Sequence, residues 1–289
     1  MGLGSFKALG GAYAIAQMIL DQCGESDLFC ENARNTASKM TFITASAGNH
    51  GLSVAAGARV FGSRAVIVLS ATVPEGFANR IRQMGAEVVR TAGSYEDSVD
   101  YAKKVADDNN WLLLADGSWE GYTERPALIK EGYTVLAEEC RVEFETINVW
   151  PDHVFLQAGV GGLAAGVAAH IREFWAVQPK IIVVEPEAAP CLLRSVEAGE
   201  LTRVEGPVSN MGRLDCKDAS LITFASLKDD ADGFQLISEQ EAEDAANMCG
   251  HYGLPTTPSG AAGIAALLKI KPDSESRCLV ILSEGPEEG

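Results

Sequence analysis

HVFLQAGVGGLAAGVAAHIREFW, the stretch at residues 153–175, contains a buried strand, a run of glycines and a helix, in that order. The strand (153–158) is short and apolar, and the helix (163–175) is rich in small residues. Glycines let backbone N–H groups turn toward one point, and a helix N-terminus adds positive potential there. The segment therefore predicts an anion site without a basic side chain. Close packing of strand on helix, with no ligand, is the structural alternative.

The same alternation of apolar strands and helices covers most of the chain and predicts an α/β protein. Apolar strands that alternate with helices indicate parallel sheets covered by helices on both faces. We predict two open, mainly parallel sheets, divided somewhere within residues 123–150, and make no assignment for 202–236. The other strands are expected at 41–46, 65–70, 86–92, 111–116, 180–185 and 278–283. The other helices are expected at 48–62, 74–85, 95–109, 123–140, 192–198, 238–252 and 259–269.

Composition and charge exclude several classes of function. The chain has 289 residues, with 40 acidic against 23 basic side chains and a net charge of −17. A field of that sign repels phosphate backbones, so we expect no nucleic-acid partner. No apolar run reaches the roughly 20 residues that span a bilayer, and no export signal is evident, so no membrane partner is expected. The seven cysteines and four histidines show no metal-binding spacing, which predicts reduced thiols in the cytoplasm and no metal site.

Four polar or glycine-rich loops follow predicted strands. They read SAGNHG (46–51), DGSWEGY (116–122), GVGGLAAG (159–166) and SEGP (283–286). Ligands of open parallel sheets bind beyond the carboxyl ends of the strands. We therefore expect the four loops to meet at one cleft.

Two readings of the second half compete at this point. Gly159, Gly161 and Ala164 also fit a dinucleotide fingerprint, and Glu185 ends the next strand where such folds place the acid for a ribose hydroxyl.

Lys7, in GSFKALGG, lies in an unusually small and apolar run. Desolvation there would favour the neutral amine that Schiff-base chemistry needs. Taken alone, the position of Lys7 favours a surface lysine.

Taken together, the motifs GSFK, SAGNHG, GxGGL and SEG resemble the fold-type-II pyridoxal-phosphate (PLP) enzymes, the tryptophan-synthase-β-like superfamily. They occur in that superfamily's order across nearly the whole chain. Within it, DGSWEGYxExP, the following IxxGY segment (129–133) and NMGRLDC (210–216) are most similar to diaminopropionate ammonia-lyases. The resemblance implies a smaller domain at 11–135 that carries the asparagine loop. It implies a larger PLP-binding domain made of residues 1–10 and 136–289, and a homodimer.

The resemblance also implies a role for individual residues. Lys7 holds the cofactor as a Schiff base and moves protons, and Phe6 lies close to the cofactor ring. Asn49 binds the phenolic oxygen, and Ser283 meets the pyridine nitrogen. Because Ser283 is a hydroxyl, that nitrogen stays largely unprotonated, which suits β-elimination. The glycine loop for the cofactor phosphate comprises Gly159, Val160, Gly161, Gly162 and Leu163. The loop for the substrate carboxylate comprises Ser46, Ala47 and Gly48.

Asp116 matches the aspartate that acts in those ammonia-lyases as a base on the L-substrate; a turn aspartate before glycine is the structural alternative. The implied reaction is α,β-elimination of 2,3-diaminopropionate, a small amino acid, to pyruvate and ammonia. Serine or threonine dehydration, which the SAGN form resembles, remains an alternative. So do a non-catalytic PLP-binding protein and an NAD-dependent oxidoreductase. Ala47 replaces an acidic residue used on the D-isomer, so that route is not expected. Because family members carry a segment before the lysine motif, we expect the chain to be N-terminally truncated.

Overall fold

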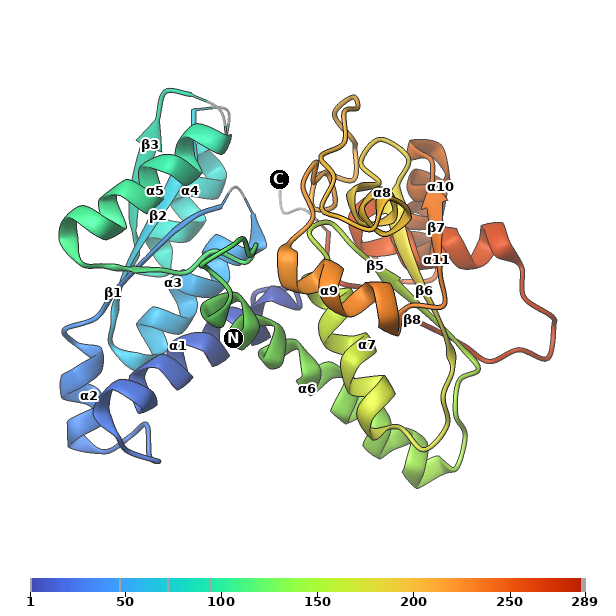
Figure 1. The fold of residues 1–289 in the computed structure, drawn as a ribbon, viewed down its shortest axis with the longest axis horizontal. Helices are drawn as coiled ribbons and strands as arrows, with labels where there is room; N and C mark the ends of the chain where they lie inside the picture. Colours follow the sequence, from blue (N-terminus) through green and yellow to red (C-terminus); the bar gives the residue numbers. More distant parts are fainter. Residues whose placement is uncertain (1, 47, 72, 94, 287–289) are drawn as a thin grey trace. The chain divides into compact units, whose positions relative to one another are not determined.

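The computed structural model describes residues 2–46, 48–71, 73–93 and 95–286. They form two compact units, each with its own four-stranded sheet (Figure 1). Unit 1 spans Met1–Asp116 and Glu124–Gly132, and unit 2 spans Gly117–Thr123 and Tyr133–Glu288. Each unit is described by itself below. The domain boundaries drawn from the sequence stay a prediction.

Unit 1 has a parallel sheet in the order β3-β2-β1-β4. The β-branched run of β2 is buried along almost its whole length, as expected of a central strand. Helices α1 and α3 end at Gly24 and Gly62, whose left-handed conformation is typical of a helix C-terminus. Its elements are α1 (Lys7–Cys23), α2 (Glu31–Ala37), β1 (Thr41–Ala45), α3 (Asn49–Phe61), β2 (Arg64–Ser70), α4 (Glu75–Gln83), β3 (Glu87–Thr91), α5 (Tyr95–Asn109) and β4 (Leu112–Leu113).

Small residues let α1 pack closely on α3. A Cβ added at Gly11 of α1 would lie 2.3 Å from Ser53 Oγ of α3, and one added at Gly57 would lie 3.0 Å from the Ala12 backbone. Ser53 Oγ also donates a 2.5 Å hydrogen bond to the carbonyl oxygen of Lys7. This contact holds the first residue of α1 against a buried helix of the same unit.

Unit 2 has a parallel sheet in the order β7-β6-β5-β8. Helix α6 (Glu124–Ile147) begins in unit 1 and continues in unit 2. Helices α10 and α11 cover the sheet with a core of small and branched side chains that includes Phe155, Ile237 and Ala265. The other elements are β5 (His153–Gln157), α7 (Gly162–Phe174), β6 (Lys180–Pro186), α8 (Cys191–Ala198), α9 (Leu221–Asp230), β7 (Gly233–Ile237), α10 (Glu239–His251), α11 (Pro258–Ile270) and β8 (Cys278–Val280).

Strand order reverses once in each sheet. Chain order runs outward from β1 to β2 and β3, then returns to place β4 on the other side of β1. In the same way β6 and β7 lie on one side of β5, and β8 lies on the other. Ligands of such sheets bind at the carboxyl ends of the strands where the order reverses. The topology thus points to the ends of β1 and β4 in unit 1, and of β5 and β8 in unit 2.

The predicted α/β class with two parallel sheets is confirmed, and several boundaries differ. Helix α6 continues to Ile147 rather than residue 140, because Arg141 pairs with Glu138 and Glu145 one turn away on either side. Strand β4 is only two residues long, although Leu114 N–H still donates to Ile43 O. The unassigned stretch 202–236 contains α9 and β7.

Candidate active site

Lys7 and Asp116 form an ion pair at the ends of α1 and β4 in unit 1. Lys7 Nζ lies 2.5 Å from Asp116 Oδ2, and the side chains are 19% and 24% exposed. Lys7 is the first residue of α1, while Asp116 follows β4 after a short extension. The pair is therefore partly shielded from water, which strengthens it relative to a surface ion pair. The reading of Lys7 as an ordinary surface lysine does not describe this environment.

Asp116 is held as a carboxylate by its neighbours. Burial by itself would raise the pKa of Asp116. The positive charge of Lys7, the nearby His50 and the hydrogen bond from Lys7 all lower this pKa, and together they outweigh the effect of burial. The net pKa lies well below the ordinary range of an aspartate. While Lys7 carries its charge, Asp116 is thus a poor proton acceptor.

His50 is a third member of this group, and the sequence analysis gave it no role. Its Nε2 lies 2.7 Å from the carbonyl oxygen of Leu114, so Nε2 carries the proton and donates it. Nδ1 is buried and has no hydrogen-bond partner within the part of the chain that the structure describes. Burial lowers the pKa of His50, against the opposing effect of Asp116. Its position directly after Asn49 in SAGNHG was the available signal.

The predicted asparagine loop joins β1 to α3. Ser46 Oγ accepts hydrogen bonds from the N–H groups of Gly48 (3.2 Å) and Gly51 (3.0 Å), so this hydroxyl shapes the loop. Asn49 begins α3, whose N-terminus has no side-chain cap at Gly48. Ala47 lies outside the described residues. The loop leaves a helix N-terminus able to receive an anion such as a substrate carboxylate.

Phe6 precedes α1 and lies beside the lysine. The Lys7 Nζ is 5.4 Å from the centre of the Phe6 ring. A cation at that distance from an aromatic face is weakly attracted to it. Phe6, Lys7, His50 and Asp116 thus lie near one another within unit 1, as the switch point of its sheet predicts.

The glycine loop of unit 2 is a cradle with no room for side chains. Gly161 precedes α7 with φ of +94°, and a Cβ there would lie 2.9 Å from both Leu192 and Thr223. A Cβ at Gly159 would lie 2.9 Å from Cys216 Sγ. No side chain caps α7, and its first turn contains no acidic residue. The loop therefore presents a helix N-terminus suited to a phosphate.

Residues before and within α9 brace this loop. Thr223 Oγ1 donates a 2.6 Å hydrogen bond to Val160 O, and Ser220 N–H donates a longer one to the same oxygen. Ser220 Oγ is also 2.6 Å from Ser118 Oγ, in the segment that follows Asp116. The bracing residues lie in the stretch for which the sequence gave no assignment.

Ser283 lies just beyond β8 and beside the end of β5. It is only 7% exposed, and its Oγ accepts a 3.1 Å hydrogen bond from Gln157 Nε2. The glycine loop begins two residues after Gln157. The structure thus brings Ser283 together with the strand that leads into the loop.

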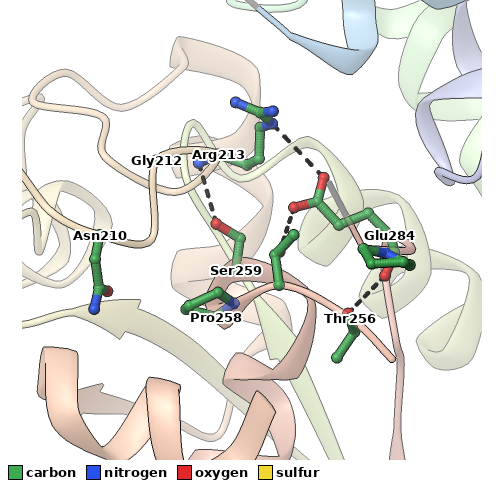
Figure 2. Close-up of a pocket in the computed structure, with 9 residues that line it drawn as sticks. Asn210, Gly212, Arg213, Thr256, Pro258, Ser259 and Glu284 are labelled. Carbon is green, nitrogen blue, oxygen red and sulfur yellow. Dashed lines mark hydrogen bonds and ion pairs between the residues drawn. The ribbon is translucent and has the colours of Figure 1, made fainter. Parts of the chain in front are cut away.

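A pocket of about 290 Å³ in unit 2 is lined in part by Glu284, the residue that follows Ser283 in the sequence. Figure 2 shows that polar groups from three segments face one another there: Arg213 with Ser259, Arg213 with Glu284, and Thr256 with the Glu284 backbone. Arg213 O would also lie 3.0 Å from a Cβ at Gly159. The segment 210–216 (NMGRLDC) therefore borders both the pocket and the glycine loop. The lining residues are Asn210, Gly212, Arg213, Thr256, Thr257, Pro258, Ser259, Glu284 and Pro286.

Glu185 does not serve as the ribose-binding acid that the dinucleotide reading required. Its side chain is fully buried, and its two oxygens accept 2.8 Å hydrogen bonds from the N–H groups of Leu192 and Leu193. The carboxylate is thus used to anchor the N-terminus of α8. A ribose could reach it only if that helix gave up both bonds.

One group of metal-ligand types occurs within residues 2–46, 48–71, 73–93 and 95–286, at Asp152, His153 and Cys278. Asp152 Oδ1 lies 2.5 Å from His153 Nδ1, and Oδ2 accepts the N–H of Arg277. These interactions account for the cluster. Within the same residues no helix is long and apolar enough to cross a membrane.

The two half-sites fit PLP. In unit 2 the cradle at Gly159–Gly162 suits its phosphate and the buried Ser283 hydroxyl suits a ring atom. In unit 1, taken by itself, Lys7 supplies a partly buried amine at the start of α1. The family comparison agrees, since residues 1–284 match the family of pyridoxal-phosphate dependent enzymes. The chain belongs to this family, and its fold is that of the fold-type-II enzymes.

Particular relatives narrow the comparison. Diaminopropionate ammonia-lyase of Escherichia coli K12 is 34% identical over 93% of this chain and 70% of its own length. The crystal structure of the E. coli enzyme with an aminoacrylate-PLP azomethine intermediate superimposes with a TM-score of 0.86 at 31% identity, over 98% of this chain and 77% of that one. A probable D-serine dehydratase of Aeromonas salmonicida is 26% identical over 94% of this chain and 65% of its own length.

Proposed function

We propose that this chain is a PLP-dependent ammonia-lyase that converts 2,3-diaminopropionate and water into pyruvate and two molecules of ammonia. The observation that carries the proposal is the shielded ion pair of Lys7 with Asp116 in a family member. It supplies an amine for the cofactor and a carboxylate beside it. The identity to diaminopropionate ammonia-lyase supports this substrate over others.

We propose the following cofactor-binding residues. Lys7 Nζ is the attachment point, Phe6 lies against the ring, and Asn49 binds the phenolic oxygen. Ser283 meets the ring nitrogen. Gly159, Val160, Gly161, Gly162 and Leu163 hold the phosphate through backbone N–H groups, and Ser46, Ala47 and Gly48 receive the substrate carboxylate.

When bound, PLP supplies an electron sink for the charge that is left when the α-proton of an amino acid is removed. The chain's residues perform the proton transfers. Lys7 Nζ, as a neutral amine beside Asp116, would accept the α-proton, and Asp116 would stabilise the ammonium so formed. Asp116 is the alternative base for the α-proton when Lys7 carries no charge. A protonated β-amino group then leaves as ammonia, and water releases the second ammonia.

Substrate choice is the finer part of the proposal. Asp116 is the residue that favours diaminopropionate, whose β-amino group must be protonated before it leaves as ammonia. The SAGN sequence of the asparagine loop, and the similarity to a probable D-serine dehydratase, support serine or threonine as the second candidate. Ala47 in place of an acid supports the L-isomer of diaminopropionate.

The test is an oxoacid assay on protein loaded with PLP, using L- and D-diaminopropionate, L-serine, L-threonine and D-serine. We expect pyruvate from L-diaminopropionate, with two ammonia molecules for each pyruvate, at the highest kcat/KM of the five. Faster turnover of serine or threonine would favour the dehydratase. Bound PLP with no oxoacid from any of them would indicate a non-catalytic binding protein.

We propose further that the enzyme works as a homodimer in the cytoplasm. The family resemblance supports the dimer. The cysteines are all free thiols, as expected of a reducing compartment. Light scattering of the purified protein tests the dimer.

A further inference from the structure

Gln157, the last residue of β5, holds the Ser283 hydroxyl from inside unit 2. Its side chain is 2% exposed. The amide nitrogen Nε2 lies 2.8 Å from Ile281 O, 3.2 Å from Gly260 O and 3.1 Å from Ser283 Oγ. The two hydrogens of this amide are thus shared among three acceptors from two segments, one containing Gly260 and the other containing Ile281 and Ser283.

The orientation of this amide is fixed by chemistry. Carbonyl oxygens can only accept hydrogen bonds, so the end of the amide that faces Ile281 O and Gly260 O must be the NH₂ group. Turning the amide over would place its oxygen against both carbonyls. The oxygen, Oε1, instead points away and has no hydrogen-bond partner among the described residues. It lies 3.3 Å from where a Cβ of Gly263 would be, so glycine leaves it room.

This orientation determines where the Ser283 proton can go. An amide NH₂ group donates and does not accept, so Gln157 cannot receive the Ser283 proton. Within residues 2–46, 48–71, 73–93 and 95–286, no hydrogen bond from Ser283 Oγ to an acceptor is present. The hydroxyl of Ser283, a residue that is 7% exposed, therefore has a donor facing its oxygen and no acceptor for its proton among the described residues. Buried polar groups are rarely left this way, so the acceptor is expected from a ligand.

We propose that Gln157 is a positioning residue that makes Ser283 a hydrogen-bond donor to the bound ligand, which on the proposed function is the ring nitrogen of PLP. A ring nitrogen that accepts a hydrogen bond from the Ser283 hydroxyl, while the proton stays on Ser283 Oγ, would remain unprotonated. It then withdraws less charge from the reacting carbon, which favours elimination over transfer of the amino group to the cofactor. Gln157 thus acts on reaction choice through Ser283, without touching the substrate.

The test uses PLP labelled with ¹⁵N in its ring, bound to the full chain and followed by NMR. Gln157→Met removes the donor at similar size, and Gln157→Glu replaces the donor with an acceptor for the Ser283 proton. We expect both variants to move the ring-nitrogen signal toward its value in Ser283→Ala, with Gln157→Glu moving it further. We also expect Gln157→Met to weaken PLP binding about tenfold, the loss of one well-placed hydrogen bond.

A double variant separates positioning from general damage. Gln157→Met should cause no further shift of the signal when Ser283 is already alanine, because its effect passes through that hydroxyl. Gln240→Met, on the exposed side of α10, should leave the signal unchanged. The inference would be overturned if neither Gln157 variant changed the ring-nitrogen signal. It would also be overturned if Gln157→Met shifted that signal as much in the Ser283→Ala protein as in the wild type. A wild-type protein that binds no PLP would instead reject the proposed function.

Discussion

At the scale of single residues, the central feature is that Lys7 controls the charge of Asp116. The ammonium of Lys7 lowers the pKa of Asp116 after burial has acted to raise it. If Lys7 were neutral, Asp116 would lose its main stabilising partner in a partly buried setting, and its affinity for a proton would rise. The basicity of Asp116 therefore depends on the charge of Lys7.

Asp116→Asn tests this coupling. We expect kcat for L-diaminopropionate to fall about 10²–10⁴-fold, the usual effect of losing a positioned acid or base, while PLP is still bound. Steady-state kinetics and the absorbance of the bound cofactor measure the two effects. Asp107→Asn, on an exposed position of α5, is the matched control and should keep wild-type kcat. Equal kcat for wild type and Asp116→Asn would assign Asp116 to turn formation alone.

The sequence predicted which loops carry polar site residues, but not which side chains meet. Lys7 and Asp116 are 109 positions apart, and their contact depends on α1 packing on α3 and on β4 pairing with β1. In the sequence, nothing distinguishes Gln157 from other polar residues at the ends of strands. Glu185 fitted a ribose acid by spacing, because spacing does not show that α8 begins close enough to use the carboxylate. Each of these depends on tertiary packing rather than on local pattern.

At the scale of elements, the strand-to-helix turn at Gly161 supports the phosphate site. Gly161→Ala adds a Cβ within 2.9 Å of two side chains at a φ of +94°. We expect a loss of about 1–3 kcal/mol in the free energy of unfolding and PLP binding at least tenfold weaker. Chemical denaturation and a cofactor titration measure them.

Gly250→Ala in α10 is the control, since a Cβ there meets no atom within 4 Å. It should leave cofactor binding unchanged and raise stability by up to about 1 kcal/mol. Equal PLP affinity in both variants would remove the glycine loop from the proposed site.

Burial of Glu185 makes the stability of the folded chain sensitive to pH. Burial raises the pKa of Glu185 from 4.5 to about 7, against the lowering effect of its hydrogen bonds. The folded state binds this proton more tightly than the unfolded state. Its contribution to stability is complete below pH 4.5 and is lost as the pH rises to about 7, a change of roughly 3 kcal/mol.

Denaturant unfolding at a series of pH values measures this effect. Glu185→Gln should remove that part of the pH dependence, whereas Glu187→Gln, whose side chain is 55% exposed, should keep it. The same slope in wild type and Glu185→Gln would contradict the assignment.

At the scale of the whole molecule, a net charge of −17 is a cost to the folded state. Like charges repel more strongly in the compact chain than in the unfolded one, and salt screens that repulsion. We expect Tm to rise when the ionic strength increases from about 10 mM to about 0.15 M, where the Debye length falls to about 8 Å. A thermal unfolding series in sodium chloride measures it, and a constant or falling Tm would show that local ion pairs outweigh the net charge.

The whole account depends on Lys7 being the residue that bonds the cofactor. Borohydride fixes a cofactor–lysine bond permanently, so the protein can be loaded with PLP, reduced, digested and analysed by mass spectrometry. The account predicts one modified peptide, containing Lys7, and none in Lys7→Arg. Modification at another lysine, or a Lys7 peptide that remains unmodified in protein that has bound PLP, would contradict it.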